Sequence, residues 1–255
     1  MEILSYGVGA RIEICAAALR GMSLSSDGAV ERLIILPIPT TRDGAYITGT
    51  ETELSALSDL LDEGTLLAGY GIPRWLREAV VSRGGAVYDS GEDEGFLLEN
   101  AKITAHGTLG RMLTETGRDV SELTVGIIGY GRIGSTLAEL LLFLGAGVRI
   151  YSESREKIRM LAEAGALVEE LSPEADFSGL DIIINTAPES LIAEERVGEL
   201  IDGGTHFIEL ASGKNYLDER IVRMASIPDK MYPLSAGRLY ARSIARAIRQ
   251  IKNGG

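Results

Sequence analysis

The sequence has very few of the side chains that form disulfides and metal sites. Cys15 is the only cysteine, and His106 and His206 are the only histidines, in 255 residues. An internal disulfide and a cysteine-based metal cluster are therefore excluded. No H-x-x-x-H pattern or paired-aspartate calcium loop supplies another ligand set, so we expect no metal site. Cys15 stands at helical spacing among apolar residues, which is typical of a buried structural thiol.

Long apolar runs and positive charge are also scarce. No run reaches the roughly 20 apolar residues that a membrane-spanning helix needs, and the first residues lack the basic and apolar regions of a signal peptide. The chain has 25 basic and 37 acidic side chains and a formal net charge of -12. Without a Lys/Arg cluster, this balance disfavours nucleic acid and anionic membrane as partners. We expect a cytoplasmic protein that binds small molecules or other proteins.

Short apolar runs alternate with helical patterns along the chain. The apolar runs cover residues 32–36, 65–68, 86–88, 123–128, 148–151, 181–185 and 205–210. The helical patterns include residues 52–61, 73–82 and 132–144. This alternation predicts an α/β protein with two doubly wound, parallel-sheet domains.

The length and one long helical pattern predict the domain boundaries. A chain of 255 residues suggests two compact domains. We expect an N-terminal α/β domain at residues 1–98, a linking helix at residues 99–117 and a Rossmann dinucleotide-binding domain at residues 118–237. The final helix, residues 238–255, is expected to complete the first domain, as terminal helices often do in two-domain dehydrogenases.

A glycine motif stands between a buried strand and an amphipathic helix, which is the context that a dinucleotide site requires. Gly129 permits the tight turn, Gly131 lets a pyrophosphate approach the backbone, and Gly134 lets the helix pack closely on the strand. The helix N-terminus offers unpaired N–H groups and a positive dipole to the diphosphate. The predicted cofactor loop consists of Gly129, Tyr130, Gly131, Arg132, Ile133 and Gly134.

The end of the following strand is expected to select between NAD and NADP. NAD-specific domains present a carboxylate to the adenosine ribose at this point. Ser152 occupies that position, and Ser154 and Arg155 would receive a 2'-phosphate, which favours NADP. Glu153 would either repel the phosphate or bind the ribose of NAD, so both cofactors stay open. Ser154 also suits the N-cap of a helix that starts at Arg155, whichever cofactor binds.

Two later buried strands end in small polar residues. They cover residues 182–185 and 207–210, and ligands of open α/β sheets lie beyond the carboxyl ends of the strands. We therefore expect further cofactor contacts, on the nicotinamide side, from Asn185, Thr186, Ala187, Pro188 and Ala211, with Ser212 next to them.

These features together resemble the family of dipicolinate synthase A subunits of spore-forming bacteria. The resemblance rests on residues 34–37, 40–44, 100–108, 125–134, 184–188 and 209–212. It implies an NAD(P)-dependent dehydrogenase that oxidises a dihydrodipicolinate-type precursor to pyridine-2,6-dicarboxylate during sporulation. It also implies that the partner is a flavoprotein, the B subunit, and that the protein acts in the mother cell. We further expect a homo-oligomer.

The sequence departs from that family in its substrate-facing parts. Residues 7–11 keep the arginine but not the aspartate of the family's Gly-Asp-x-Arg motif, and residues 213–215 replace its Pro-Gly-Gly turn. The segment 19–32 is short, and His106 stands where glutamate is usual. A non-catalytic nucleotide-binding subunit is therefore one alternative. A D-2-hydroxyacid dehydrogenase is another. That family needs an arginine directly after the strand that ends at residues 211–212 and a late histidine as acid/base, whereas here Gly213 and Lys214 follow that strand and no histidine occurs after His206.

The long helix carries the candidate acid/base group. Thr104 and His106 are expected to face the cleft between the domains, because Ala105, Gly107 and Thr108 around them are small. His106 would take the proton that is lost on aromatisation. The alternative is a histidine on the helix surface.

A dianionic substrate needs fixed cations in a chain with a net charge of -12. Arginine grips a carboxylate with two parallel hydrogen bonds. We expect this role from Arg42 and from Arg238 on the opposite wall of the cleft, with further substrate contacts from Thr40 and Thr41 beside Arg42. Arg11 is a third candidate, and Ser212 is expected nearby. The alternative is that each arginine pairs with a neighbouring acid, as Arg42 would with Asp43.

Overall fold

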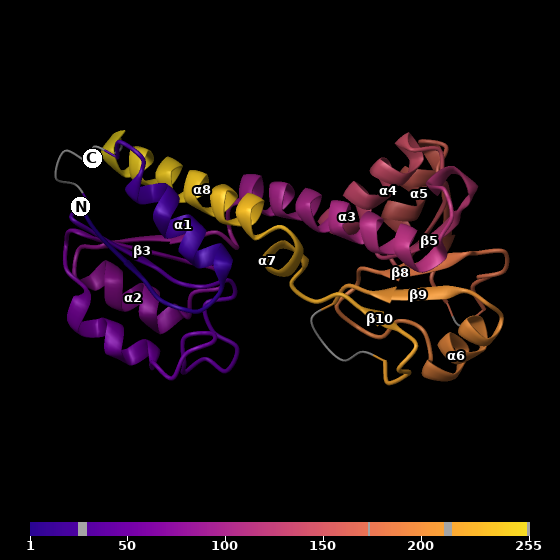
Figure 1. Cartoon of the computed structure of the whole chain (residues 1–255), viewed down its shortest axis with the longest axis horizontal. Coiled ribbons are helices and arrows are strands. Elements are labelled where there is room, and N and C mark those ends of the chain that lie inside the picture. The colour runs from indigo at the N-terminus through magenta and orange to yellow at the C-terminus, as the bar shows by residue number, and fades with distance from the viewer. Residues whose placement is uncertain (25–29, 173, 212–215, 254–255) are drawn as a thin grey trace. The chain divides into compact units, whose positions relative to one another are not determined.

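The computed structural model describes residues 1–24, 30–172, 174–211 and 216–253. The chain forms two compact units (Figure 1). Unit 1 comprises Met1–Asn100 and Pro228–Gly255, and unit 2 comprises Ala101–Ile227. The chain leaves unit 1 within the long helix α3 (Glu94–Thr116) and returns near the short helix α7 (Ile227–Met231). In the described part of the chain, no helix is long and apolar enough to cross a membrane.

Unit 1 is built on a parallel four-stranded sheet in the order β1-β2-β3-β4. The strands are β1 (Glu2–Ser5), β2 (Arg32–Ile35), β3 (Thr65–Gly69) and β4 (Ala86–Asp89). The helices of this unit, besides the start of α3 and most of α7, are α1 (Ala10–Arg20), the 3-10 helix η1 (Leu54–Leu60), α2 (Arg74–Ser82) and α8 (Pro233–Asn253).

The helices of unit 1 cover both faces of the sheet. Helices α1 and α8 pack on each other over one face, while η1 and α2 cover the other (Figure 1). The connections β1-α1-β2 and β3-α2-β4 step across the sheet in the same direction, with their helices on opposite faces. The two crossovers therefore have opposite hands, and one of them departs from the usual right-handed connection.

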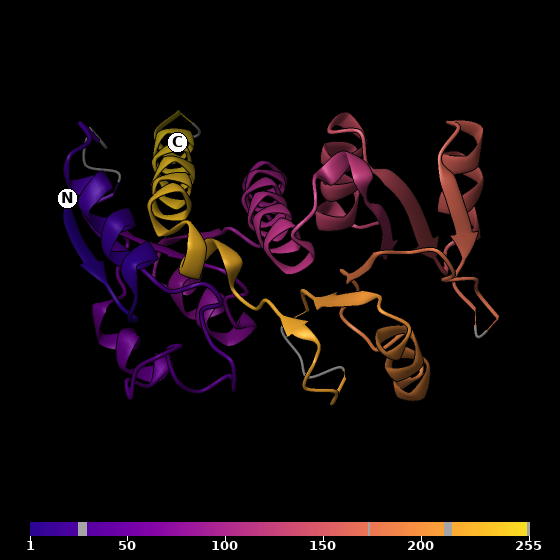
Figure 2. The ribbon, with the colours of Figure 1, turned by 45° about the vertical axis from the view of Figure 1, so that its right-hand side comes forward.

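Unit 2 contains a parallel six-stranded sheet in the order β10-β9-β8-β5-β6-β7. The strands are β5 (Thr124–Ile128), β6 (Gly147–Ser152), β7 (Leu167–Glu170), β8 (Ile182–Asn185), β9 (His206–Glu209) and β10 (Val222–Arg223). The connecting helices are η2 (Val120–Glu122), α4 (Arg132–Phe143), α5 (Arg155–Glu163) and α6 (Glu194–Asp202). Helices α4 and α5 lie on one face of the sheet and α6 on the other (Figures 1 and 2).

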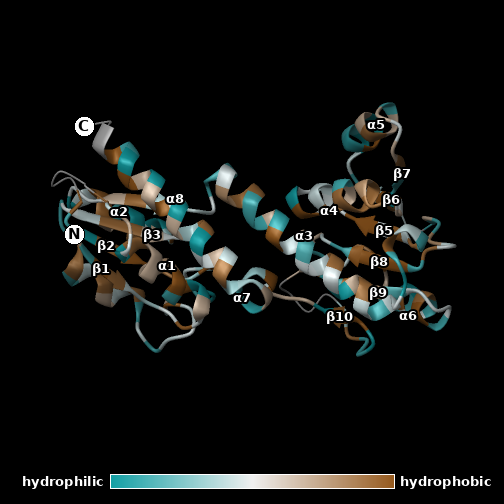
Figure 3. Cartoon of the chain, turned by 45° about the horizontal axis from the view of Figure 1, so that its top comes forward, coloured by the Kyte–Doolittle hydropathy of each residue, from teal (hydrophilic) through white to brown (hydrophobic). Residues whose placement is uncertain are grey.

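The strand order of unit 2 determines where a ligand can bind. The chain runs outward from β5 to β7 and then resumes with β8 on the other side of β5. This is the doubly wound order, whose switch point lies between β5 and β8. Strands β5 and β8 are strongly hydrophobic, whereas α5 alternates between hydrophilic and hydrophobic residues (Figure 3). The predicted fold class, two parallel-sheet α/β domains, is confirmed.

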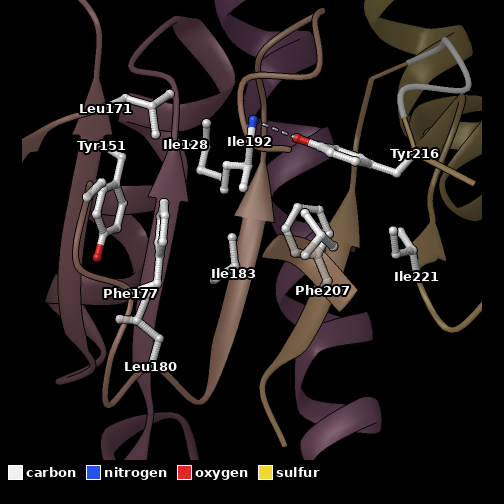
Figure 4. Close-up of a cluster of buried hydrophobic side chains, with 12 residues drawn as sticks. Ile128, Tyr151, Leu171, Phe177, Leu180, Ile183, Ile192, Phe207, Tyr216 and Ile221 are labelled. Atoms are coloured by element: carbon white, nitrogen blue, oxygen red, sulfur yellow. Dashed lines mark hydrogen bonds between the residues drawn. The ribbon is translucent and has the colours of Figure 1, made fainter. Parts of the chain in front are cut away.

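An aromatic core supports the strands that carry the switch point (Figure 4). Tyr151 stacks on Phe177 with ring centroids 4.6 Å apart, and Phe207 meets Tyr216 at 5.3 Å in an edge-on arrangement. Each such side chain contributes about 1.5–3 kcal/mol by burial. The Tyr216 hydroxyl accepts a hydrogen bond from the Ile192 N–H at 3.4 Å. These packed rings and this hydrogen bond therefore stabilise the segments that follow strands β8 and β9.

Two expectations about single elements have different outcomes. Cys15 is fully buried in α1, as predicted, and burial raises the pKa of its thiol to about 12. The helix expected at residues 52–61 is instead the 3-10 helix η1. Its N-terminus has no side-chain hydrogen-bond cap, and its seven residues exceed the three or four that 3-10 helices usually reach.

Candidate dinucleotide site

The loop between β5 and α4 has the backbone shape that its glycines predict. Gly129 has φ of 89°, a left-handed conformation that favours glycine. A Cβ on Gly134 would overlap the carbonyl oxygen of Gly129, so this position requires the absence of a side chain. A Cβ on Gly131 would meet no described atom within 4 Å. The space beside Gly131 is therefore open to a ligand.

The N-terminus of α4 provides the donors for a diphosphate. Gly131 is its N-cap residue and cannot offer a side-chain acceptor, and no side-chain hydrogen bond caps this end. The first N–H groups of a helix have no partner within the helix and carry its positive dipole end. A helix N-terminus of this kind, next to an open glycine, fits a nucleotide diphosphate.

A hollow lies beside this loop at the carboxyl edge of the sheet. Residues from the loops after β5, β6 and β8 line it, namely Gly129, Tyr130, Tyr151, Ser152, Glu153, Ser154, Lys157, Ala187, Pro188, Glu189 and Leu191. We call it the cofactor hollow. It brings together predicted residues from three separate stretches of the sequence. The predicted residues Gly131, Arg132, Ile133, Gly134, Arg155, Asn185, Thr186 and Ala211 are not among its lining residues.

The end of β6 forms a hydrogen-bonded turn into α5. Ser152 is only 6% exposed, and its Oγ accepts a hydrogen bond from the Ser154 N–H at 3.2 Å. Ser154 is the N-cap of α5, and its Oγ accepts the Lys157 N–H at 3.4 Å. The predicted capping role of Ser154 is therefore confirmed. Glu153 is exposed and lines the cofactor hollow.

The basic side chain beside the hollow is Lys157, which the sequence-based prediction did not include. Its Nζ donates to the Tyr130 carbonyl oxygen at 3.0 Å, so the ammonium group lies against the loop that follows β5. The side chain of Arg155 is 87% exposed and pairs with Glu170 at 3.3 Å. A lysine in the first turn of the helix after β6 is the signal that could have identified this cation.

Asn185 occupies a different place from the one expected. It is fully buried, and its Nδ2 donates to Glu209 Oε2 at 2.9 Å. Its Oδ1 accepts the Ala187 N–H at 3.1 Å. Because both ends of the amide are engaged inside the protein, Asn185 shapes the loop and does not line the hollow. Thr186 is also turned inward, since its hydroxyl donates to the Ile128 carbonyl oxygen at 2.9 Å.

The end of β9 is described only in part. The Ala211 N–H donates to Glu209 Oε1 at 2.7 Å. Glu209 itself is 1% exposed and was not among the predicted site residues. Ser212, for which both a substrate contact and a place beside the nicotinamide were expected, lies outside the described residues.

Thr104 and His106 do not share a face of α3, which corrects the expectation that both line one cleft. Thr104 is 6% exposed, whereas His106 is exposed to solvent. Residues that are two positions apart in an α-helix, as Thr104 and His106 are, point in directions that differ by roughly 200° around the helix axis. The small neighbours Ala105 and Thr108 are buried with Thr104. A common cleft-facing surface for the pair is therefore excluded by helix geometry.

Arg11 is engaged inside unit 1. It is 5% exposed, and its two terminal nitrogens bind Asp229 at 3.2 Å and Asn100 at 2.7 Å. The guanidinium also lies 5.7 Å from the ring centre of Phe96. Both groups that could grip a carboxylate are thus occupied, and the expected substrate contact of Arg11 is not supported by its geometry.

Arg42 and Arg238 both belong to unit 1, so the expectation that they stand on opposite walls is wrong. Arg238 lies in α8, which packs along α1. Both arginines are exposed, and neither forms an ion pair with the described residues. The alternative pairing of Arg42 with Asp43 is also absent from the described part of the chain.

The neighbours of Arg42 form a hydrogen-bonded turn. Asp43 accepts the N–H groups of Ala45 and Tyr46, both at 2.9 Å, and these bonds hold its pKa below the usual range. The Thr41 hydroxyl donates to Asp43 at 3.1 Å. Thr40 is fully buried, and its Oγ1 accepts the Tyr70 N–H at 2.9 Å. Thr40 therefore has a structural role in this loop.

Comparison with known proteins agrees with this geometry. A family model described as "D-isomer specific 2-hydroxyacid dehydrogenase, NAD binding domain" matches residues 98–225. The chain is 25% identical over 172 residues to the dipicolinate synthase A subunit of Bacillus subtilis, and this match covers 63% of this chain and 57% of that protein. It is 33% identical over 100 residues to a glyoxylate reductase of Thermococcus kodakarensis, which covers 38% and 30%. The match to either relative thus spans less than two thirds of that relative's length.

Solved structures share the fold over nearly the whole chain. The dipicolinate synthase A chain from Bacillus subtilis superposes with a TM-score of 0.77 at 18% identity, covering 100% of this chain and 98% of that one. The corresponding protein from Bacillus halodurans gives 0.74 at 19% identity, with 97% of each chain covered. The predicted resemblance to dipicolinate synthase A subunits is confirmed. Because the matching model covers half of the sequence, the chain belongs, through this nicotinamide-cofactor domain, to the D-isomer specific 2-hydroxyacid dehydrogenase family.

Proposed function

We propose that this chain is the NAD(P)-dependent dehydrogenase subunit that forms dipicolinate from a dihydrodipicolinate-type precursor during sporulation. The observation that carries the proposal is the cofactor hollow at the switch point of unit 2, beside an uncapped helix N-terminus and the open Gly131. The substrate class is supported by the likeness of the whole chain to dipicolinate synthase A structures.

The residues of unit 2 fit the cofactor that this reaction requires. The first N–H groups of α4 would hold the diphosphate, and the turn from Ser152 to Ser154 would hold the adenosine ribose. When bound, the cofactor would supply the acceptor for a hydride from the substrate ring. The gain of aromaticity provides much of the driving force. His106, exposed on α3, stays a prediction for the group that takes the released proton.

We further propose that the chain prefers NADP and that Lys157 meets its 2'-phosphate. Ser152 replaces the carboxylate that NAD-specific domains place at this strand end. Lys157 lines the hollow, and its ammonium group lies 3.0 Å from the Tyr130 carbonyl oxygen. A phosphate bound there would also lie near the N-terminus of α5. Lys157 takes this role in place of Arg155, because the side chain of Arg155 does not line the hollow.

The remaining parts of the proposal follow from the similarity to a protein named as one subunit of a synthase. A flavoprotein second subunit is the proposed partner, the mother cell of a sporulating bacterium is the proposed location, and self-association is proposed as well. Pull-down of the chain from sporulating cells and size measurements on the purified protein test these points.

The decisive experiment supplies chemically generated dihydrodipicolinate to the purified chain. We expect reduction of NADP, with stoichiometric formation of dipicolinate, either by the chain alone or after the flavoprotein subunit is added. Cofactor binding without dipicolinate formation under both conditions would contradict the proposal and favour a non-catalytic nucleotide-binding protein. Glyoxylate and pyruvate with NADPH are included, because the family match makes a 2-hydroxyacid dehydrogenase the second candidate.

A further inference from the structure

The carboxyl ends of β8 and β9 carry a buried amide–carboxylate pair that the proposed function does not yet use. Asn185 is 0% exposed and Glu209 is 1% exposed. The two residues are partners in the parallel sheet, and each is the last residue of its strand. Asn185 Nδ2 donates to Glu209 Oε2 at 2.9 Å, while Glu209 Oε1 accepts the Ala211 N–H at 2.7 Å.

Asn185 also forms hydrogen bonds to the loop that follows β8. Its Oδ1 accepts the Ala187 N–H at 3.1 Å, and its Nδ2 lies 3.3 Å from the Ala187 carbonyl oxygen. A carboxylate accepts only and a backbone N–H donates only, so the amide has a single orientation that satisfies both neighbours. Ala187 and Pro188 line the cofactor hollow. Glu209 therefore fixes, through one side chain, a loop that contacts the ligand space.

The same carboxylate also fixes the loop that leaves β9, through the Ala211 N–H. Burying a carboxylate costs free energy unless hydrogen bonds compensate it, and hydrogen bonds to an ionised acceptor are stronger than neutral ones. An apolar side chain would pack at this place without that cost. We therefore attribute the presence of a carboxylate at this buried position to its hydrogen bonds, which hold the two loops in place, and not to side-chain packing.

The topology indicates which half of the dinucleotide these loops serve. In a doubly wound sheet the two halves of the cofactor lie on either side of the switch point. The end of β6, with Ser152 and the first turn of α5, lies on the adenosine side. Strands β8 and β9 lie on the other side of β5. The Asn185–Glu209 pair therefore stands beneath the nicotinamide half.

We propose that Glu209 is a positioning residue for the nicotinamide half of the cofactor, which acts through Asn185 and the Ala211 N–H. This inference rests on the proposed nicotinamide-dependent function. The β5–α4 loop and the turn after β6 are the other groups expected to hold the adenosine and diphosphate part. Because Ala187 and Pro188 line the same hollow as Ser152 and Lys157, changes at Glu209 should weaken ADP slightly and the full dinucleotide more strongly.

The test uses Glu209→Gln, Asn185→Asp and the double variant Asn185→Asp/Glu209→Gln in the full chain. Calorimetry measures the dissociation constants of NADP, of NAD and of ADP, which lacks the nicotinamide half. We expect Glu209→Gln to weaken the dinucleotide on the order of tenfold, because an amide at this position keeps one acceptor oxygen and its NH2 group then faces a donor, either the Asn185 NH2 or the Ala211 N–H. ADP affinity should fall by less than about threefold. Asn185→Asp should be worse, because two carboxylates would meet in a buried place.

The double variant exchanges the two groups and restores the pairing. The new carboxylate on β8 would accept from the new amide on β9 and from the Ala187 N–H, and the oxygen of that amide would accept the Ala211 N–H. The contact of the Asn185 NH2 group with the Ala187 carbonyl oxygen is lost in this variant, so we expect a dinucleotide affinity between that of Glu209→Gln and that of the unaltered protein. Glu170→Gln is the matched control, since Glu170 ends β7 on the adenosine side of the same sheet and is half-exposed. It should leave the dinucleotide dissociation constant unchanged.

Three results would overturn the inference. They are equal loss of ADP and dinucleotide in Glu209→Gln, unchanged dinucleotide affinity in that variant, and a double variant that folds but recovers no affinity. If Glu209→Gln does not fold, the double variant alone decides, through its ADP and dinucleotide constants. An unaltered chain that binds ADP but neither dinucleotide would instead refute the proposed function, so the two failures are distinguishable.

Discussion

The absence of a side chain at single glycine positions has two different consequences at the start of α4 in unit 2. Gly131 and Gly134 stand three positions apart at the start of α4, the first as its N-cap residue and the second in its first turn, yet their surroundings differ. The space beside Gly131 is open, whereas the Gly129 carbonyl oxygen blocks any Cβ on Gly134. The first glycine is thus kept free for a ligand, and the second is required by the packing of α4.

This contrast predicts separate effects on binding and stability. We expect Gly131→Val to weaken cofactor binding by at least about tenfold, because the new side chain occupies the approach of the diphosphate, with an unfolding temperature close to that of the unaltered chain. Gly134→Val should lower the unfolding temperature instead. Gly198→Ala in α6, where a Cβ has open space, is the control and should change neither quantity adversely. Calorimetry and thermal unfolding measure both. Full cofactor affinity in folded Gly131→Val would refute the site.

Cofactor choice gives a second prediction at this scale. Lys157→Met should weaken NADP by about tenfold or more and leave NAD nearly unchanged, since a charge-assisted phosphate contact is lost. Arg155→Met should change either affinity by less than about twofold, because exposed ion pairs contribute little and this side chain is 87% exposed. Isothermal titration with both cofactors compares the variants. A larger NADP loss in Arg155→Met would return the phosphate contact to Arg155.

At the scale of elements, the helix α1 shows how one buried charge can hold several segments. Arg11 joins α1 to Asn100 in α3 and to Asp229 in α7, at 2.7 and 3.2 Å. Its Nε is buried and has no hydrogen-bond partner among the described residues. Removal of the guanidinium leaves the Asn100 amide oxygen without its donor and the partly exposed carboxylate of Asp229 without its counter-ion, and it removes a buried side chain that packs on Phe96.

We therefore expect Arg11→Met to destabilise unit 1 on the order of 3 kcal/mol. Urea unfolding, followed by tryptophan fluorescence, measures the change, since Trp75 lies in α2 of the same unit. Arg20→Met, on an exposed position of the same helix with a 3.3 Å bond to a carbonyl oxygen, should change stability by less than about 0.5 kcal/mol. Equal effects of the two substitutions would contradict the role assigned to Arg11.

The sequence predicts the central elements well and the peripheral ones poorly. Buried strands such as β5 and β8 are continuous apolar runs, and the glycine motif between β5 and α4 has the geometry expected of it. The strands β1 and β7 have exposed first and last residues and no fully buried position, so they lack the continuous apolar run by which β8 is recognised. Both lie at sheet edges, where one side of the strand needs no apolar cover.

Site residues could be predicted from the sequence where their role depends on backbone conformation. They could not be predicted where their role depends on the direction in which a side chain points. Gly129 and the cap Ser154 follow from local rules on turns and helix ends. The exchange of Arg155 for Lys157 depends on the phase of α5, which places one side chain at the hollow and the other in solvent. Glu209 was missed because its partner, Asn185, is 24 residues away and meets it only through the sheet register.

At the scale of the whole molecule, net charge opposes the proposed substrate. A formal charge of -12 repels a dicarboxylate over long distances. Local cations must overcome this repulsion. Arg42 and Arg238, exposed in unit 1 and without an ion pair to the described residues, are the candidates that the structure leaves available.

Arg42→Ala and Arg238→Ala should each lower kcat/KM for the dicarboxylate roughly thirty- to a hundredfold, because a charge-assisted carboxylate contact contributes about 2–3 kcal/mol. The dependence of kcat/KM on salt concentration provides an independent test.

In the unaltered chain, added salt should lower kcat/KM, since it screens the attraction between arginine and carboxylate. In the double variant only the long-range repulsion remains, and salt should raise kcat/KM. Arg74→Ala, at an exposed position paired with Glu78 in α2, is the control and should retain both the rate and the salt dependence. Variants at Arg42 and Arg238 that keep the normal rate and the normal response to salt would show that the dianion is bound elsewhere or is not the substrate.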